Sequence, residues 1–314
     1  MERAGLSSSK STYKKGFMYY VKRDLFLYLL LVLPITYFII FKYIPMYGIV
    51  IAFKEYNIFA GINASEWIGL DAFKEIFRSQ DFIRALRNTF LLNGLDLILG
   101  FPAPIILALI INEIKRNSFK KISQTMLYLP HFLSWVIIGG IVLQIFAPGF
   151  GLIDTLLKSA GLKTIPFLTD NVPWIFTYCG VGIWQSAGWG MIMYLAAITG
   201  INGELYEAAE VDGAGRLRKI WSITLPCIRP TIVILFILNV GKISAIGFDR
   251  PYVIGNPEVR DFADVISTYV YRVGIQSTRY NIATAVGLFQ SVVGLLFLSV
   301  TNFIANKSGE QGIW

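Results

Sequence analysis

Histidine, cysteine and charged side chains are all scarce in this chain of 314 residues. A single histidine, His131, excludes a His-Glu-x-x-His zinc site, which needs two. Cys179 lies inside an apolar run and Cys227 follows a polar segment, so we expect both to be packing residues that do not pair. No Gly-x-x-x-x-Gly-Lys-Ser/Thr run is present, so the chain has no phosphate-binding loop of its own. We therefore expect no catalytic site, no metal site and no cofactor bound by this chain.

Apolar residues, by contrast, are abundant. Hydrophobic residues make up 55% of the chain and charged residues only 15%, which is typical of an integral membrane protein and not of a soluble domain. The net charge is +8, and what matters chiefly is on which side of the membrane the positive residues lie. No nucleic-acid motif accompanies it, and we expect lipid, not nucleic acid, around the chain.

The apolar runs are long enough to cross a bilayer several times, since a helical span needs about 20 apolar residues. We expect an all-α membrane protein with one domain at 25–304, a basic segment at 1–24 and a tail at 305–314. The basic first segment predicts that both ends are cytoplasmic. Pro102 and Pro104 are expected to kink or break the second span, and residues 72–77 to form a short helix at the outer surface. The six predicted spans are 25–44, 89–111, 126–146, 173–199, 231–246 and 281–304.

A polar stretch at 201–229 interrupts the apolar pattern. Residues 204–211 can form a short helix, Gly213 and Gly215 allow a sharp turn, residues 216–221 can resume the helix, and Pro226 is expected to stop it. Without further information, this stretch could be a surface loop with solvated charges. The same stretch, however, carries three short runs in a fixed order.

These three runs resemble the EAA loop of permease subunits of ABC importers. The resemblance implies a type I importer permease with the MetI-like fold. In that family the loop carries a coupling helix that docks on a separate ATPase, and that ATPase binds ATP and magnesium. Glu210 departs from the pattern by adding a second acid. The matching residues are Glu207, Ala208, Ala209, Asp212, Gly213, Ala214, Ile223, Leu225 and Pro226.

Four further runs resemble the LplB-type branch of carbohydrate permeases, which are relatives of the maltose permease subunits. These runs are 42–57, 100–109, 128–135 and the Gly-Glu-Gln-Gly-Ile-Trp ending at 309–314. The resemblance implies a multi-pass subunit of a bacterial inner (cytoplasmic) membrane that pairs with a second permease subunit, in a heterodimer, above two ATPases. It also implies a solute-binding protein or lipoprotein that delivers an oligosaccharide from outside.

Polar residues inside the predicted spans are candidates for the translocation path, because a charge at the bilayer centre is costly and usually faces protein or water. Lys242 either lines a hydrophilic passage with Asn239, or neutralises Asp96 within the bundle, or extends its ammonium to a membrane interface. Aromatic and amide side chains suit sugar rings, but a membrane tryptophan also serves packing. Arg250, Arg260, Arg272 and Arg279 are expected in outer loops, where they could meet an acidic sugar or a binding protein. The candidates are Gln144, Trp184, Gln185, Trp189, Asn239 and Lys242.

Three alternatives stay open. A permease of the same architecture could carry a solute other than a sugar, since the EAA pattern does not specify the cargo. A membrane enzyme would need paired acids or a metal cluster near a membrane face, which the sequence does not offer. A receptor or structural subunit would keep its role after loss of Glu207 and Gly213.

Overall fold

The computed structural model describes residues 18–19, 23–309 and 312–313. The lysines at 10, 14, 15 and 22, and part of the 309–314 ending, lie outside the described residues. The chain divides into two compact units, residues 1–50 and residues 51–314, and each unit is described here by itself.

In the first unit, residues 25–50 form one helical run. It comprises α2 (Leu25–Phe38), the π-helical turn η1 (Ile39–Tyr43), α3 (Ile44–Met46) and the start of the 3₁₀ helix η2 (Tyr47–Phe53). The run Leu25–Phe53 is long and apolar enough to cross a membrane, which confirms the first predicted span and extends it by nine residues.

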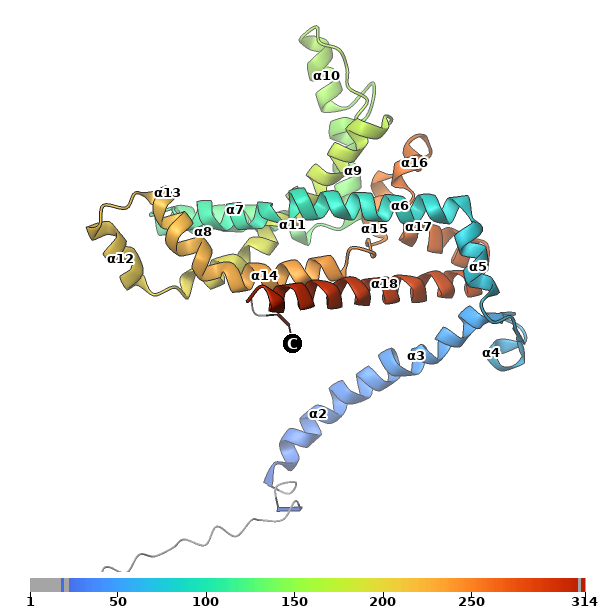
Figure 1. The fold of residues 1–314 in the computed structure, drawn as a ribbon. Coiled ribbons are helices and arrows are strands. Elements are labelled where there is room, and N and C mark those ends of the chain that lie inside the picture. The colour runs from blue at the N-terminus through green and yellow to red at the C-terminus, as the bar shows by residue number, and fades with distance from the viewer. Residues whose placement is uncertain (1–17, 20–22, 310–311, 314) are drawn as a thin grey trace, which may run out of the picture. The chain divides into compact units, whose positions relative to one another are not determined.

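The second unit is mostly helical (Figure 1). Its two short strands, β1 (Lys54–Glu55) and β2 (Glu66–Trp67), pair antiparallel with Lys54 opposite Trp67. The helices of its first half are α4 (Gly61–Ala64), α5 (Asp71–Arg78), α6 (Gln80–Leu95), η3 (Asp96–Gly100), α7 (Pro102–Asn112), α8 (Asn117–Tyr128), η4 (Leu129–Phe132), α9 (Trp135–Phe146) and α10 (Leu152–Ser159). Those of its second half are α11 (Asn171–Thr199), α12 (Gly203–Val211), α13 (Arg216–Lys219), η5 (Ile220–Thr224), α14 (Leu225–Gly241), α15 (Asp249–Ile254), η6 (Pro257–Val259), α16 (Arg260–Ala263), α17 (Ile266–Val270), η7 (Tyr271–Gln276) and α18 (Tyr280–Lys307).

Among the described residues, five helices pass as membrane spans by length and composition, and a bent pair makes a sixth if it counts as one span. The bent pair corrects the prediction of a straight third span at 126–146. Its two parts, Asn117–Phe132 and Trp135–Phe146, meet at 102°. The break follows Pro130, and Ser134 starts the new helix by accepting a hydrogen bond from the Ile137 N–H at 3.4 Å.

Two proline predictions have different outcomes. Pro102 and Pro104 distort the second span only locally, and Gln80–Asn112 stays one span: the Phe101 N–H donates to the Asp96 carbonyl five residues back at 3.1 Å, which is the π-helical spacing of η3. Pro226, in contrast, does not stop its helix. It lies in the first turn of α14, where a proline is tolerated, and the π-helical turn η5 precedes it without a gap. The fifth span therefore runs over Arg216–Gly241, not 231–246.

The remaining predicted helices agree with the structure. The fourth and sixth predicted spans differ from α11 and α18 by three residues or fewer at either end. Residues 72–77 lie within the short helix α5, and residues 204–211 within α12.

The interior of the second unit holds three hydrophobic clusters. The first lies between α6, α9 and α11, the second between α5, α6, α17 and α18, and the third between α7, α11 and α14. The long helices thus run side by side, with α12 and α13 at one end of the unit and α5, α16 and α17 at the other (Figure 1).

Candidate functional site

The stretch at 201–229, which we call the coupling loop, begins with a well-capped helix. The Asn202 side chain accepts a hydrogen bond from the Glu204 N–H at 3.0 Å, which satisfies a free donor at the start of α12. The Tyr206 hydroxyl lies 2.9 Å from the Thr224 hydroxyl and so joins α12 to η5. The Lys219 ammonium donates a hydrogen bond to the Glu210 carboxylate across the loop. These contacts hold the loop as a folded hairpin of helices.

The turn at the end of α12 requires a glycine. The Ala214 N–H donates to the Ala209 carbonyl at 2.8 Å, and the Gly213 N–H donates to the Glu210 carbonyl at 3.0 Å. This is the Schellman arrangement, and it places Gly213 in the left-handed region with φ +71°. Gly215, which was also expected in the turn, has an ordinary φ of −69°. Only Gly213 therefore needs its glycine for backbone conformation.

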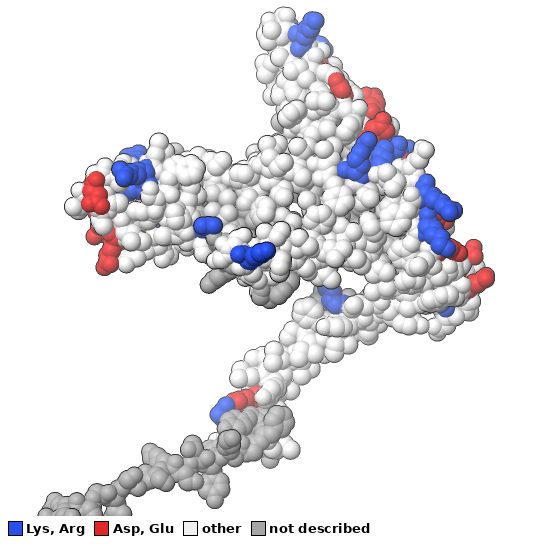
Figure 2. Space-filling model, viewed as in Figure 1, with Lys and Arg blue, Asp and Glu red and all other residues white. Residues whose placement is uncertain are grey.

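The coupling loop is exposed and partly apolar. Acidic and basic side chains gather at the end of the unit that carries α12 and α13 (Figure 2). Between them, Val211 is 89% exposed, Leu217 74% and Trp221 71%. Large exposed apolar side chains rimmed by charges are typical of a surface that meets another protein.

The predicted coupling residues fall into two groups. Glu207 and Ala208 are exposed on α12, and Leu225 and Pro226 form the first turn of α14. Most of the others surround a pocket of about 160 Å³ between α12 and the α13–η5 helix. This second group is Ala209, Asp212, Ala214 and Ile223.

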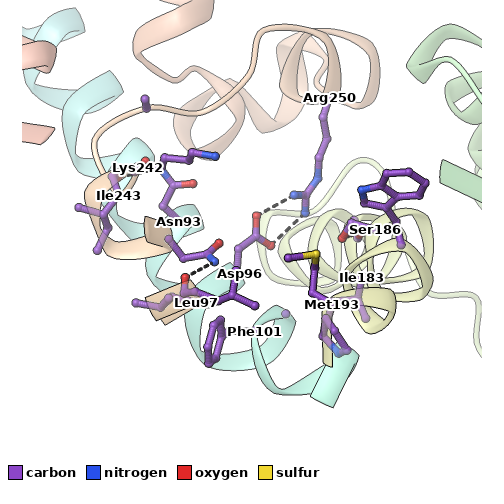
Figure 3. A pocket seen from close by; sticks show the side chains of 18 of the residues that line it. Asn93, Asp96, Leu97, Phe101, Ile183, Ser186, Met193, Lys242, Ile243 and Arg250 are labelled. Atoms are coloured by element: carbon purple, nitrogen blue, oxygen red, sulfur yellow. Dashed lines mark hydrogen bonds and ion pairs between the residues drawn. The ribbon is translucent and has the colours of Figure 1, made fainter. Parts of the chain in front are cut away.

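A larger cavity, of about 550 Å³, lies between the long helices (Figure 3). Its walls come from the α6–η3–α7 run, from α11, from α14 and from the segment that leads to α15. Three of the six predicted path residues line it: Trp189, Asn239 and Lys242. Lys242 is the first residue after α14, not a residue within the span as expected, and Asn239 lies one turn before it.

The other three predicted path residues lie outside this cavity. Trp184 lines a separate apolar groove against α7 and α8. The Gln185 amide donates to the His131 carbonyl at 3.5 Å, and the His131 ring stacks on Trp189 with 4.7 Å between the ring centroids. Gln144 is exposed on α9.

Inside the cavity, Asp96 and Arg250 form an ion pair with two hydrogen bonds. Arg250 Nη1 lies 2.7 Å from Asp96 Oδ2, and Nη2 lies 3.2 Å from Oδ1 (Figure 3). Of the alternatives for Lys242, neutralisation of Asp96 is therefore wrong, and so is the expectation that Arg250 belongs to an outer loop free for a partner. A planar guanidinium fits both oxygens of a carboxylate, which a lysine ammonium does not.

The surroundings hold Arg250 in place. Its guanidinium carbon lies 3.6 Å from the centroid of the Tyr178 ring, a cation–π contact, and its Nη2 also donates to the Tyr178 carbonyl. A Cβ at position 182 would lie 2.3 Å from the guanidinium carbon, so only a glycine leaves room there. The arginine side chain is 14% exposed and the Asp96 side chain 29%. Sequence reasoning named Arg250 as an outer-loop arginine and missed its place in the cavity and its pairing with Asp96.

The other outer-segment arginines also pair within the chain. Arg272 lies 2.9 Å from Asp264, and Arg279 forms two hydrogen bonds with Glu75 at 2.6 and 2.7 Å. Arg260 lies 3.9 Å from Asp81. The two cysteines are free thiols; Cys179 is buried as expected, whereas Cys227 is exposed and is not a packing residue of this chain.

Comparison with known proteins identifies the family. The model of the family described as "Binding-protein-dependent transport system inner membrane component" matches residues 100–308. The chain belongs to this family, and its fold is the MetI-like fold of ABC transporter permeases. It is a membrane subunit of the permease kind, as the resemblance implied.

Relatives and a solved structure agree along most of the chain. Protein LplB of Bacillus subtilis (strain 168) is 46% identical over 295 residues, which is 94% of this chain and 92% of that protein. The polygalacturonan/rhamnogalacturonan transport system permease protein YteP of the same organism is 44% identical over 289 residues, 92% of this chain and 90% of that protein. A chain of a bacterial alginate ABC transporter, solved in complex with an alginate pentasaccharide-bound periplasmic protein, matches with a TM-score of 0.86 and 42% identity, over 95% of this chain and 100% of that chain.

Proposed function

We propose that this protein is a permease subunit of an ATP-driven importer and that it carries an oligosaccharide into the cytoplasm. In this proposal it pairs with a second permease subunit and receives its cargo from a solute-binding protein. Two separate ATPase subunits bind ATP and magnesium and move the coupling loop. The permease itself breaks no bond.

The coupling loop is the observation that carries the proposal. Its helix α12 is fixed by an asparagine cap and a glycine turn, and it presents Glu207 and Ala208 to solvent at one end of the unit. The small Ala208 allows close approach of a partner, and the exposed apolar side chains of Val211 and Trp221 offer it area to bury. Because η5 joins the loop to α14 without a break, a push on α12 is transmitted to a membrane helix.

The side chains that line the cavity are suited to bind a polar cargo that is rich in hydroxyl groups. The Asn93 amide donates to the Ile243 carbonyl at 2.7 Å, and the Asn239 amide donates to the Leu235 carbonyl at 2.8 Å. Since both amide nitrogens bond to backbone, their carbonyl oxygens are left as acceptors for hydroxyl groups. Trp189 adds an aromatic ring to the wall, against which a sugar ring can stack. The names of the relatives, which concern polygalacturonan, rhamnogalacturonan and alginate, point to the same kind of cargo.

Co-purification tests the proposal. The tagged full-length chain, extracted in mild detergent from cells that express its neighbouring genes, is expected to bring down an ATPase and a second permease. The double variant Glu207→Ala, Gly213→Asp is expected to lose the ATPase and keep the permease, because only the coupling loop is changed. Gly215→Ala is the matched control, since it lies in the same loop with an ordinary φ and open space around it. Recovery of the chain alone from cells with active uptake would contradict the proposal and favour a receptor or structural subunit.

A further inference from the structure

The cavity holds a cation without a counter-ion. Its charged lining residues are Asp96, Arg250 and Lys242. Asp96 uses both carboxylate oxygens on Arg250, so these two charges cancel. No salt bridge joins Lys242 to a carboxylate anywhere in residues 18–19, 23–309 and 312–313, and the cavity therefore has a net charge of +1.

The position of Lys242 is fixed by its backbone. The Lys242 N–H donates to the Asn239 carbonyl at 3.0 Å, and the next carbonyl, of Ile243, accepts from the Asn93 amide at 2.7 Å. These bonds tie the end of α14 to α6. In Figure 3 the Lys242 side chain lies beside Asn93 and points into the cavity. Arg250 lies on the other side of the cavity.

The end of a helix favours a cation, and this accounts in part for a lysine after α14. It does not account for a lysine that faces a cavity beside two amide oxygens. The Lys242 side chain is exposed and lines the cavity, so its ammonium is accessible to an anionic group of a ligand. Because Arg250 already occupies both oxygens of the carboxylate on the cavity wall, an anion that pairs with Lys242 in the cavity has to come from a ligand.

We propose that Lys242 binds a carboxylate group of the cargo, so that the transported oligosaccharide is acidic, for example one that contains uronic acid residues. This inference rests on the proposed function and adds the charge of the cargo to it. The ammonium pairs with the carboxylate, the oxygens of Asn93 and Asn239 accept hydrogen bonds from hydroxyl groups, and Trp189 contacts a ring face. The Asp96–Arg250 pair stays closed and excludes a second positive charge from contact with the ligand.

Binding measurements on the full-length chain, purified with the subunits that accompany it and placed in lipid nanodiscs, test the proposal. The probes are trigalacturonate, its methyl ester, which has the same rings without charge, and maltotriose. We expect the wild type to bind trigalacturonate about ten- to a hundredfold more tightly than the ester, which corresponds to one charge-assisted hydrogen bond. Lys242→Gln is expected to reduce this ratio to about one, and Lys242→Arg to keep most of it.

A second lysine variant controls for long-range electrostatics. Lys163→Gln removes the same charge from an exposed loop that does not line the cavity, and it should leave the ratio unchanged. The inference is wrong if the ester or maltotriose binds as tightly as trigalacturonate, or if Lys242→Gln keeps the preference for trigalacturonate. Either result leaves the proposed function, import of an oligosaccharide, unaffected. If none of the three sugars binds to the wild type, the proposed cargo class fails as well.

Discussion

Arg250 forms a two-point ion pair with Asp96, a residue 154 positions earlier in the chain. The pair connects the π-helical turn η3, which the two prolines create, with the short helix α15. Because α11 lies behind the guanidinium with Tyr178 and Gly182, three parts of the chain meet at this pair. It is therefore a structural contact of the cavity wall as well as the reason why Lys242 stays unpaired.

Breaking this pair is expected to destabilise the protein. Asp96→Asn leaves the Arg250 charge without its carboxylate in a largely buried position, and we expect a loss of about 3 kcal/mol in the free energy of unfolding. The double variant Asp96→Asn, Arg250→Met should lose clearly less than the sum of the two single changes. Unfolding of the detergent-solubilised protein with SDS measures each value. Asp71→Asn, which breaks the exposed pair with Lys74, is the control and should change the free energy by less than about 1 kcal/mol. Additive single effects would show that the two residues do not interact.

Docking of the ATPase is expected to weaken when Gly213 is replaced by any residue with a side chain. Gly213→Ala places a Cβ in the left-handed region at an energetic cost of about 1–2 kcal/mol, whereas Gly213→Asn should lose less, because asparagine tolerates that conformation. The measurement is the amount of ATPase retained on the purified permease. Gly215→Ala should retain the wild-type amount. Equal retention by Gly213→Ala would mean that the turn is not needed for docking.

The ion pair across the coupling loop has a defined pH dependence. The hydrogen bond from Lys219 lowers the pKa of Glu210 below its usual range. A lowered pKa in the folded loop means that the contact stabilises the loop above the ordinary glutamate pKa of about 4.3 and is lost as the pH falls through the lower folded value. Carbon-13 NMR of labelled glutamate should give a titration midpoint for Glu210 below that of a free glutamate, and Lys219→Met should raise it. The neighbouring change Arg218→Met should leave the midpoint in place. An unchanged midpoint in Lys219→Met would exclude the contact.

At the opposite end of the unit, Asn88 is expected to be essential for stability. Its fully buried side-chain amide donates to the carbonyls of Asp261 and Asp264, both at 2.8 Å. Asn88→Ala removes the donor to the buried Asp264 carbonyl, whereas the Asp261 carbonyl keeps its hydrogen bond from Arg87 at 2.7 Å, and we expect a loss of about 1–3 kcal/mol in the free energy of unfolding. The exposed Asn117→Ala should change it by less than about 0.5 kcal/mol. Similar values for the two variants in SDS unfolding would show that the 261–264 segment is held by other contacts.

The sequence predicts the bounds of the long helices well, because the length of an apolar run alone largely determines where such a helix begins and ends. The bounds of α11 and α18 agree within three residues, and the 204–211 helix of the coupling loop agrees with α12. Local proline chemistry was predicted less well. Pro130 bends the third span, and Pro226 does not stop the helix that it enters, because its place in the first turn makes the missing N–H harmless.

Pairing across the chain was not predictable from the sequence. Lys242 was one candidate partner for Asp96, since both fall in apolar runs, and nothing in the sequence places α15 against η3. The choice of Arg250 follows from tertiary packing: a glycine at 182 and the Tyr178 ring make room for a guanidinium and stabilise it. Of the two predicted tryptophans, Trp189 lines the cavity, whereas Trp184 lies in a different pocket.

ATP-dependent uptake is the most direct test of the central claim, that this chain is the membrane path of an oligosaccharide importer. The purified complex in proteoliposomes, with ATP inside and a binding protein loaded with labelled oligosaccharide outside, is expected to accumulate the label. Accumulation should stop when ATP is omitted, and the Glu207→Ala, Gly213→Asp variant should abolish it. The account would be contradicted if the label accumulates without ATP. It would also be contradicted if no label accumulates although the ATPase of the complex is active and the binding protein is loaded.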